Sequence, residues 1–153
     1  MNTKIIEKHS ELEEVINNCE VCYVSMVDKD GKPYVLPFNF AYEDNKIYLH
    51  SGSFGKKLDI LKVNPDVCIA FSLGHKLFHH HETVACSYSM TYKSVVASGK
   101  VEFEEDIQKK TDIMNKVMMK YTGKTFEYSK PAITNVSCFV INIIEISGRN
   151  RGM

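Results

Sequence analysis

Apolar and strand-forming residues gather in six runs, which are separated by polar, turn-forming residues. The runs are rich in β-branched and aromatic side chains, which favour strands, and they are Val21–Asp28, Tyr34–Tyr42, Lys46–Ser51, Val67–Leu73, Tyr92–Glu104 and Asn135–Gly148. Between the first two runs, Asp30-Gly31 supplies the positive φ of a tight hairpin turn. Pro37 has no N–H to donate, so the second run is expected at a sheet edge or a bulge. Gly99 is expected to bend the fifth run.

Three other segments carry apolar residues at the spacing of one helical face, which predicts helices. They are Glu11–Asn18, Phe54–Val63 and Glu105–Tyr121. Ser10 and Glu13 have the S-x-x-E spacing of a capping box at the start of the first helix. Ser53 is expected to cap the second helix, which Asn64-Pro65 ends. Gly123 is expected to cap the third helix at its C-terminal end.

The order of these elements predicts one domain over residues 1–153 with a mainly β fold. Turns of hairpin length join most of the strands, and strands do not alternate with helices as they do in parallel sheets. We therefore expect an antiparallel β-barrel with peripheral helices. The least regular segment, residues 74–84, is expected to be a loop or an excursion from the sheet.

Composition narrows the classes of partner. The 153 residues carry a formal net charge of zero, which argues against a dedicated nucleic-acid binder because such proteins usually carry a basic excess. Neutrality also favours burying surface in an oligomer. The sequence has no apolar run of the length of a membrane helix and no signal-peptide pattern at its start. With five cysteines in no disulfide framework, the sequence predicts a cytoplasmic protein with reduced thiols.

The segment "IYLHSGSFGKKLDILKVNP" is the strongest candidate for binding chemistry. It is not a nucleotide P-loop, because His50 stands where the motif needs its first glycine and Lys57 where it needs Ser or Thr. A strand, a glycine turn and a helix start nevertheless suit an anion, since a helix N-terminus presents free N–H groups. The residues alone leave a second interpretation open, a capped surface helix with solvated lysines.

Two further patterns favour ordinary structural roles. Cys19 and Cys22 form a C-x-x-C pair, but neither a second pair nor histidines at ligand spacing accompany it. We expect Cys22 in the core and Cys19 as a loop thiol. The His79–His81 run is expected on a surface loop, because three consecutive side chains of a strand cannot all face one metal.

Three segments taken together resemble a known family. "PYVLPFNFAY", "IYLHSGSFGKKLDILKVNPDVCIAF" and "YKSVVASGKVEF" are similar in order and spacing to the flavin-binding split barrels of the pyridoxamine 5′-phosphate oxidase superfamily. Within it, the sequence looks most like the 5-nitroimidazole resistance (nitroimidazole reductase) proteins. The resemblance extends from Leu12 to Gly148. It implies an antiparallel split β-barrel of the FMN-binding type, with FMN bound at a homodimer interface.

The resemblance also implies which residues contact the flavin ring. Pro37, Phe38 and Asn39 match the strand that lies along the isoalloxazine. Lys93 and Ser94 match a strand whose polar side chains reach the flavin. The oxidases typically have Arg-Gln at this pair, so Lys93-Ser94 departs from their pattern and disfavours a true pyridoxamine 5′-phosphate oxidase.

The remaining matches concern the phosphate end of FMN. His50 and Ser51 match the end of the strand that leads to the phosphate. Ser53, Lys56 and Lys57 match the phosphate-binding turn and the start of its helix. His50 is also the candidate proton donor or substrate contact, because an unperturbed histidine titrates near neutral pH; the alternative is a partly buried histidine that a backbone carbonyl satisfies.

The resemblance implies an FMN-dependent oxidoreductase. The expected electron donor is reduced nicotinamide or ferredoxin, and the expected acceptor is a small aromatic compound such as a 5-nitroimidazole. Two alternatives remain: a non-catalytic flavin- or haem-binding protein, and pyridoxamine 5′-phosphate oxidase. Arg149 and Arg151 in the tail either reach a neighbouring site or belong to a solvated end of the chain.

Overall fold

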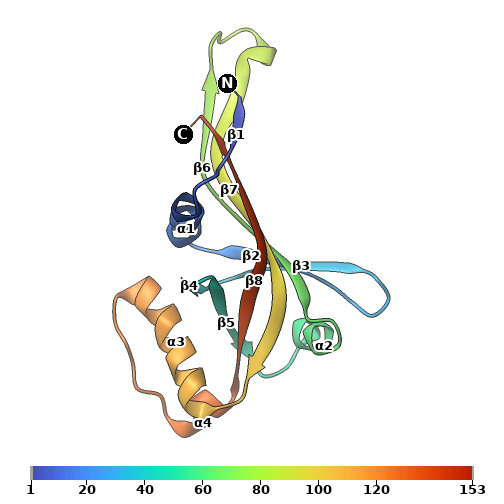
Figure 1. The fold of residues 1–153 in the computed structure, drawn as a ribbon, viewed down its shortest axis with the longest axis vertical. Helices are drawn as coiled ribbons and strands as arrows, with labels where there is room; N and C mark the ends of the chain where they lie inside the picture. The colour runs from blue at the N-terminus through green and yellow to red at the C-terminus, as the bar shows by residue number, and fades with distance from the viewer. Residues whose placement is uncertain (1, 153) are drawn as a thin grey trace.

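The computed structural model describes residues 2–152 and consists mainly of strands (Figure 1). The eight strands are β1 (Thr3–Ile5), β2 (Cys22–Val27), β3 (Pro33–Phe38), β4 (Ala41–Glu43), β5 (Lys46–Gly52), β6 (Asp66–His79), β7 (Tyr88–Glu104) and β8 (Val136–Arg151). The helices are α1 (His9–Asn18), α2 (Lys56–Val63), α3 (Ile107–Thr122) and α4 (Lys130–Thr134), with a 3₁₀ turn at Ala85–Ser87.

All strands belong to one antiparallel sheet. Its order is β3-β2-β6-β7-β8-β5-β4, and β1 pairs with β8 outside this path. The sheet curves around a core but does not close, because β3 and β4 end the order. The expected mainly β, antiparallel architecture is confirmed. Pro37 lies in β3, an end strand, where its missing N–H removes no central ladder bond.

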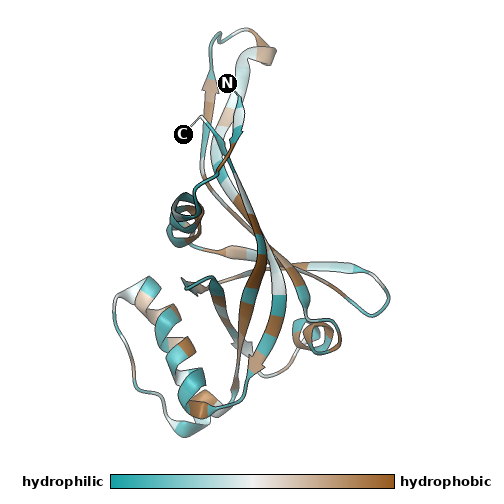
Figure 2. Cartoon of the chain, viewed as in Figure 1, coloured by the Kyte–Doolittle hydropathy of each residue, from teal (hydrophilic) through white to brown (hydrophobic). Residues whose placement is uncertain are grey.

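The core lies where the strands cross in the body of the molecule. Its largest fully buried side chains include Phe40, Phe71, Phe139, Met26, Ile47, Leu49 and Ile141. Figure 2 shows hydrophobic residues concentrated in this central part of the strands, while α3 alternates polar and apolar residues along its length. α1 packs against β6 and β7, and α3 packs against β4 and β5. The helices therefore cover the sheet from outside, as the sequence predicted.

The two longest strands, β7 and β8, are paired with each other and bend beside Gly99. The pairing of β7 with β8 shifts register between Ser98 and Gly99. A Cβ atom at Gly99 would lie 2.1 Å from the carbonyl oxygen of Asn142, so only glycine allows the two backbones to approach this closely. The expected bend at Gly99 is confirmed.

The starts of the first two helices differ from expectation. α1 begins at His9, and its N-cap residue, Lys8, makes no side-chain capping bond, so the Ser10–Glu13 capping box is wrong. Glu13 instead faces His9 one turn earlier, with Oε1 3.1 Å from Nε2. α2 begins at Lys56 after Gly55, so Ser53 is not its cap.

The C-terminal half contains one confirmed cap and one unpredicted helix. Gly123 ends α3 with φ of 69°, the left-handed conformation expected of a glycine C-cap. α4 was not predicted, although its sequence carries the usual signals: the Ser129 hydroxyl accepts from the Ala132 N–H, and Pro131 lies in the first turn. Its five residues are too few to show a helical period.

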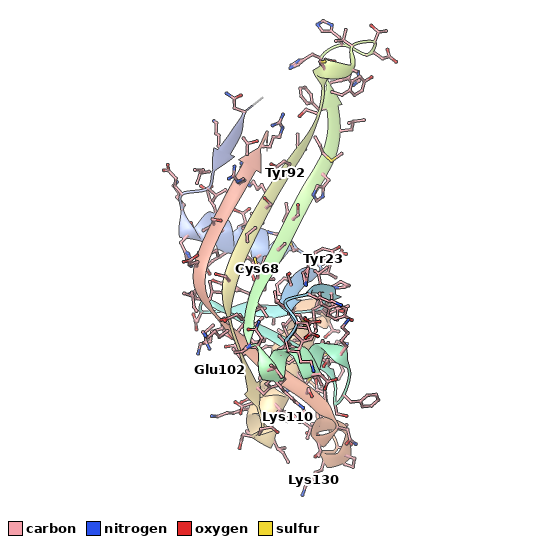
Figure 3. The ribbon with its side chains drawn as sticks, turned by 90° about the vertical axis from the view of Figure 1, so that its right-hand side faces the viewer. Tyr23, Cys68, Tyr92, Glu102, Lys110 and Lys130 are labelled. Carbon is pink, nitrogen blue, oxygen red and sulfur yellow. The ribbon has the colours of Figure 1, made fainter. Side chains whose placement is uncertain are left out.

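Residues 74–84 form the expected excursion from the sheet and not a loop. β6 continues to His79, and with β7 it forms a long hairpin arm that projects from the body (Figures 1 and 3). Only residues 80–84 turn the chain before the 3₁₀ segment. The loop alternative was wrong because the pairing shifts register between Leu73 and Lys76, which interrupts the strand pattern in the sequence.

The C-terminal arginines do not belong to a solvated tail. β8 extends to Arg151, whose Nε donates to the Ser89 hydroxyl at 3.0 Å and whose guanidinium also contacts Thr3. Arg149 pairs with Ser94 across β7 and β8. Among residues 2–152, none of the helices is both long and apolar enough to cross a membrane.

Candidate functional site: the β5–α2 turn

The end of β5 brings the predicted phosphate residues to the surface. Ile47 and Leu49 point into the core and are fully buried, so Tyr48 and His50 point to the other face of the sheet. Gly52 ends the strand, and the chain then turns through Ser53 to the start of α2. Because the side chains of β5 alternate between the two faces of the sheet, the strand places His50 on the face opposite the core and leads directly into the turn.

His50 is half-buried at the end of β5. Its Nδ1 atom is buried and has no hydrogen-bond partner among residues 2–152. Burial lowers the pKa of His50, because the charged ring loses solvation. Buried polar atoms are normally hydrogen-bonded, so this nitrogen is the kind of group that a bound molecule would satisfy.

The surroundings of His50 come from β8 and α3. His50 pairs with Cys138, so both side chains lie on the same face of the sheet. Cys138 is buried, its thiol lies 3.8 Å from the Lys110 carbonyl oxygen, and burial raises its pKa to about 11. Lys110 is itself buried, and its Nζ donates to the Thr134 carbonyl at 3.4 Å.

The start of α2 has the features of an anion site. No side chain caps its N-terminus, and Gly55 precedes it with φ of 131°, a conformation that L side chains rarely adopt. Lys56 and Lys57 occupy the first two helical positions. The unbonded N–H groups of this first turn and the two ammonium groups together favour a phosphate. Leu58 fixes the helix by packing into the core.

The predicted ring-contacting strand lies next to this helix start. The Nζ of Lys56 lies 4.6 Å from the centre of the Tyr34 ring in β3. Pro37 and Asn39 are exposed, whereas the Phe38 ring is buried against Phe139, with centroids 6.0 Å apart. Phe38 therefore has only its backbone to offer a ligand outside the barrel.

Lys93 and Ser94 lie far from the turn within one chain. Ser94 pairs with Arg149 of β8, whereas His50 pairs with Cys138, eleven positions earlier on the same strand. At about 3.3 Å per residue, roughly 35 Å of strand separates them. Figure 3 agrees, because Tyr92 lies well up the hairpin arm while Lys110, which contacts Cys138, lies near the opposite end.

Two side chains near the site were not predicted. Phe54, within the turn itself, is 85% exposed, which is unusual for a phenylalanine. Ser51, which was predicted to bind the cofactor, turns its hydroxyl back onto the Gly52 carbonyl at 2.9 Å. The burial of Lys110 has no signal in the sequence, because the rest of α3 reads as an ordinary amphipathic helix.

The competing metal and thiol interpretations gain no support. Cys22 is a core residue, as expected, and Cys19 is also buried at the end of α1 rather than exposed on a loop. Burial raises the pKa of the Cys22 thiol to about 12. His79, His80 and His81 are exposed, and no group of three or more metal-ligating side chains exists within residues 2–152.

Comparison with known proteins decides the family. The family model for pyridoxamine 5′-phosphate oxidase matches residues 8–150. The chain belongs to the pyridoxamine 5′-phosphate oxidase family. The match includes β3, the β5–α2 turn and β7, the segments on which the resemblance was based. No curated protein matches the chain.

Similar solved structures refine this comparison. A candidate 5-nitroimidazole antibiotic resistance protein from Bacteroides thetaiotaomicron VPI-5482 is 42% identical, with a TM-score of 0.88 over 97% of this chain and 87% of that one. An FAD-binding protein from Mesorhizobium loti is 26% identical, with a TM-score of 0.71 over 99% and 100%. The flavocytochrome Anf3 from Azotobacter vinelandii, 19% identical with a TM-score of 0.83 over 97% and 70%, shares the fold. The resemblance to nitroimidazole resistance proteins is confirmed.

The burial of His50 predicts a pH-dependent stability. Its folded-state pKa lies below the unfolded value, so protons bind the unfolded chain more readily. Above about pH 6.5 this pKa difference has no effect on stability. As pH falls below that value, it lowers the free energy of unfolding. We expect a His50→Gln variant to lose less stability than the parent protein between pH 7 and pH 5, measured by urea denaturation. His80→Gln, on the exposed turn, serves as the control, and equal profiles for parent and His50→Gln would contradict the assignment.

Proposed function

We propose that this protein is an FMN-dependent oxidoreductase that reduces small aromatic acceptors such as 5-nitroimidazoles. The observation that carries the proposal is the uncapped start of α2, where Lys56 and Lys57 follow His50 and the glycine turn. The chain that carries this arrangement is itself 42% identical to a candidate nitroimidazole resistance protein.

The residues present fit the phosphate of FMN. Lys56 and Lys57 supply two positive charges, and the free N–H groups of α2 supply hydrogen-bond donors. The Ser53 hydroxyl lies in the exposed turn between them and His50. Edge strand β3, with Pro37 exposed in the strand and Asn39 exposed just after it, gives the flavin ring a rigid wall beside this turn.

Bound FMN would supply transfer of hydride or electrons from reduced nicotinamide or ferredoxin to the acceptor. The protein's own task is to hold and orient both molecules. Because burial lowers the pKa of His50, its ring is mainly neutral at pH 7. We therefore assign His50 to hydrogen bonding with the acceptor or flavin rather than to delivering a proton as an imidazolium ion. The expectation of a histidine titrating near neutral pH is revised accordingly.

A homodimer completes this proposal. Roughly 35 Å of strand separates Ser94 from His50 within one chain, so one flavin can meet both groups only if two chains contribute. Cys68, Val96, Ser98 and Ile144 help to line a shallow hollow of about 630 Å³ on the outer face of β6–β7–β8. Ile144 is 66% exposed and Val96 is 46% exposed there, which suits a surface covered by a second copy.

Pyridoxamine 5′-phosphate oxidation is the less favoured activity. Lys93-Ser94 stands where the oxidases typically have Arg-Gln, and a lysine cannot form the planar, two-pronged contact of an arginine. Arg151 is engaged with Ser89 and Thr3 of its own chain, which leaves it less free to hold a substrate phosphate.

The central experiment loads the purified protein with FMN and follows its chemistry. We expect a flavin absorption spectrum, bleaching by reduced nicotinamide or ferredoxin under anaerobic conditions, and turnover of a 5-nitroimidazole to its reduced product, detected by chromatography. A colourless protein that takes up no FMN would contradict the proposal. A Soret band would point to haem, and a flavin that no donor reduces would indicate a non-catalytic flavin carrier.

The proposed homodimer leads to a prediction for a substitution at its interface. Ile144→Glu places a charge in the exposed apolar patch on β8, and burying that charge opposes association. We expect the dimer to dissociate at least ten-fold more readily, measured by analytical ultracentrifugation, with reduced FMN retention. Leu77→Glu on the hairpin arm, where the side chain is 61% exposed, is the matched control. A monomeric parent protein that still retains FMN would contradict a site shared between two chains.

A further inference from the structure

A second hollow lies on the opposite side of the molecule from the β5–α2 turn. It has a volume of about 730 Å³, within the range of small-molecule sites. Its lining comes from α1, β4, α3 and the segment after α3, namely Asn17, Ala41, Tyr42, Glu43, Asp112, Asn115, Lys116, Met119, Lys120 and Thr125. Figure 1 shows α2 and α3 on opposite sides of β8, so this groove is separate from the proposed FMN turn.

Lys120 is the unusual group in this groove. Its Nζ lies 3.8 Å from the centre of the Phe40 ring and donates to the Asn17 carbonyl at 3.2 Å. Burial lowers the pKa of Lys120, since the ammonium loses part of its solvation. None of the four ion pairs formed within residues 2–152 includes it. A partly desolvated cation without a carboxylate partner is costly, and an incoming anion would relieve that cost.

The other charged groups of the groove already have partners. Lys116 forms an ion pair with Glu43, and this contact crosses from α3 to β4. Asp112 accepts a hydrogen bond from the Gln108 amide at 3.1 Å. The two lysines and two carboxylates of the groove balance in charge, but none of the ion pairs within residues 2–152 gives Lys120 a carboxylate partner. Glu43 and Asp112 would repel a ligand of higher negative charge.

The rest of the lining is neutral or apolar. Ala41 is buried, Met119 is 48% exposed, and the Tyr42 ring is half-buried. The Tyr42 hydroxyl is buried and has no hydrogen-bond partner among residues 2–152. Burial, with the nearby Glu13 carboxylate, raises the pKa of Tyr42, so its hydroxyl stays protonated. Such a surface suits a ligand with an apolar body and one polar end.

We propose that the groove between α3 and β4 binds an organic monocarboxylate, with the carboxylate at Lys120 and the apolar body against Met119 and Ala41. This site is independent of the proposed flavin chemistry. A single carboxylate matches the one ammonium of the groove that has no ion-pair partner within residues 2–152, whereas a phosphate dianion would meet Glu43 and Asp112 and too few donors.

The test compares benzoate with benzyl alcohol, which has a similar apolar body but no charge. We expect isothermal titration of the parent protein to detect benzoate but not benzyl alcohol, and Lys120→Met to weaken benzoate binding at least ten-fold. Lys62→Met, an exposed lysine near the end of α2, removes the same charge elsewhere and should leave binding unchanged.

Lys120 faces the buried Cys19 and Cys22 thiols, whose raised pKa values keep them protonated. It also faces the Phe40 and Tyr121 rings. Benzoate binding should therefore also weaken as pH rises through the lowered pKa of Lys120 itself.

A second measurement needs no variant. Amine-reactive succinimidyl ester, followed by peptide mass spectrometry, should label Lys120 at least five-fold more slowly in saturating benzoate, with Lys62 unaffected. The proposal would be overturned if benzoate and benzyl alcohol bound equally well, or if Lys120→Met bound benzoate as tightly as the parent protein. It would also be overturned if benzoate did not slow the labelling of Lys120. If inorganic phosphate protected Lys120 from labelling more strongly than benzoate does, the choice of a monocarboxylate would be overturned.

Discussion

Replacing both Lys56 and Lys57 with alanine is expected to weaken FMN binding about a hundred-fold. Each lysine would donate a charge-assisted hydrogen bond to the phosphate, and such bonds contribute about 1.5–3 kcal/mol apiece. Loss of about 3 kcal/mol corresponds to roughly a hundred-fold in Kd. Fluorescence titration of the flavin-free protein with FMN measures the change directly.

The fold should survive this double substitution. Lys56 contributes a cation–π contact with Tyr34, worth about 0.5–1 kcal/mol at an exposed site, so stability should fall by no more than about 1 kcal/mol. Lys62→Ala, on the same helix but in its last turn, is the matched control and should retain normal FMN affinity. Unchanged affinity in the double variant would mean that Lys56 and Lys57 are only solvated, as the alternative interpretation holds.

The second large effect concerns the bend between β7 and β8. Gly99→Ala places a Cβ atom 2.1 Å from the Asn142 carbonyl oxygen and 3.0 Å from the Ile141 side chain. The nearer obstacle is backbone in a central strand pair, so it cannot rotate aside as a side chain would. We expect the free energy of unfolding to fall by about 3 kcal/mol, the upper part of the range for overpacking.

Urea denaturation followed by circular dichroism measures this loss. Gly52→Ala is the matched control, because a Cβ there meets no atom within 4 Å and its strand position needs no unusual backbone angle. Its stability should stay within about 0.5 kcal/mol of the parent protein. Similar stability in both variants would show that β7 and β8 can separate at Gly99 at little cost.

The two sets of substitutions act on different parts of the protein. Gly99 allows β7 and β8 to bend together, and β8 then carries Cys138 opposite His50 at the end of β5. The lysines of α2 act only through charge at the surface. Damage to the bend should therefore affect flavin binding through loss of folded protein, whereas damage at α2 should affect binding in a protein that remains folded.

The sequence predicted most strands because their patterns are local. Gly31 has a positive φ of 79°, and Gly99 leaves no room for a Cβ atom beside the Asn142 carbonyl, so these two glycines mark the hairpin and the bend directly. Helix starts were less secure. Ser10 and Ser53 are good capping residues, but Lys8 and Gly55 occupy the N-cap positions, because packing of each helix against the sheet decides where it begins.

By itself, the sequence determined the mainly antiparallel fold, the family resemblance and the order His50, glycine turn, Lys56. These depend on residue types at fixed spacing. Only the tertiary structure decided that, within residues 2–152, His50 Nδ1 is buried without a partner and Lys120 lies half-buried without a carboxylate in an ion pair. It also decided that roughly 35 Å of strand separates Ser94 from the turn in one chain. Burial, and the distance between residues far apart in sequence, depend on how the sheet curves and which helix covers it, and local patterns do not contain that information.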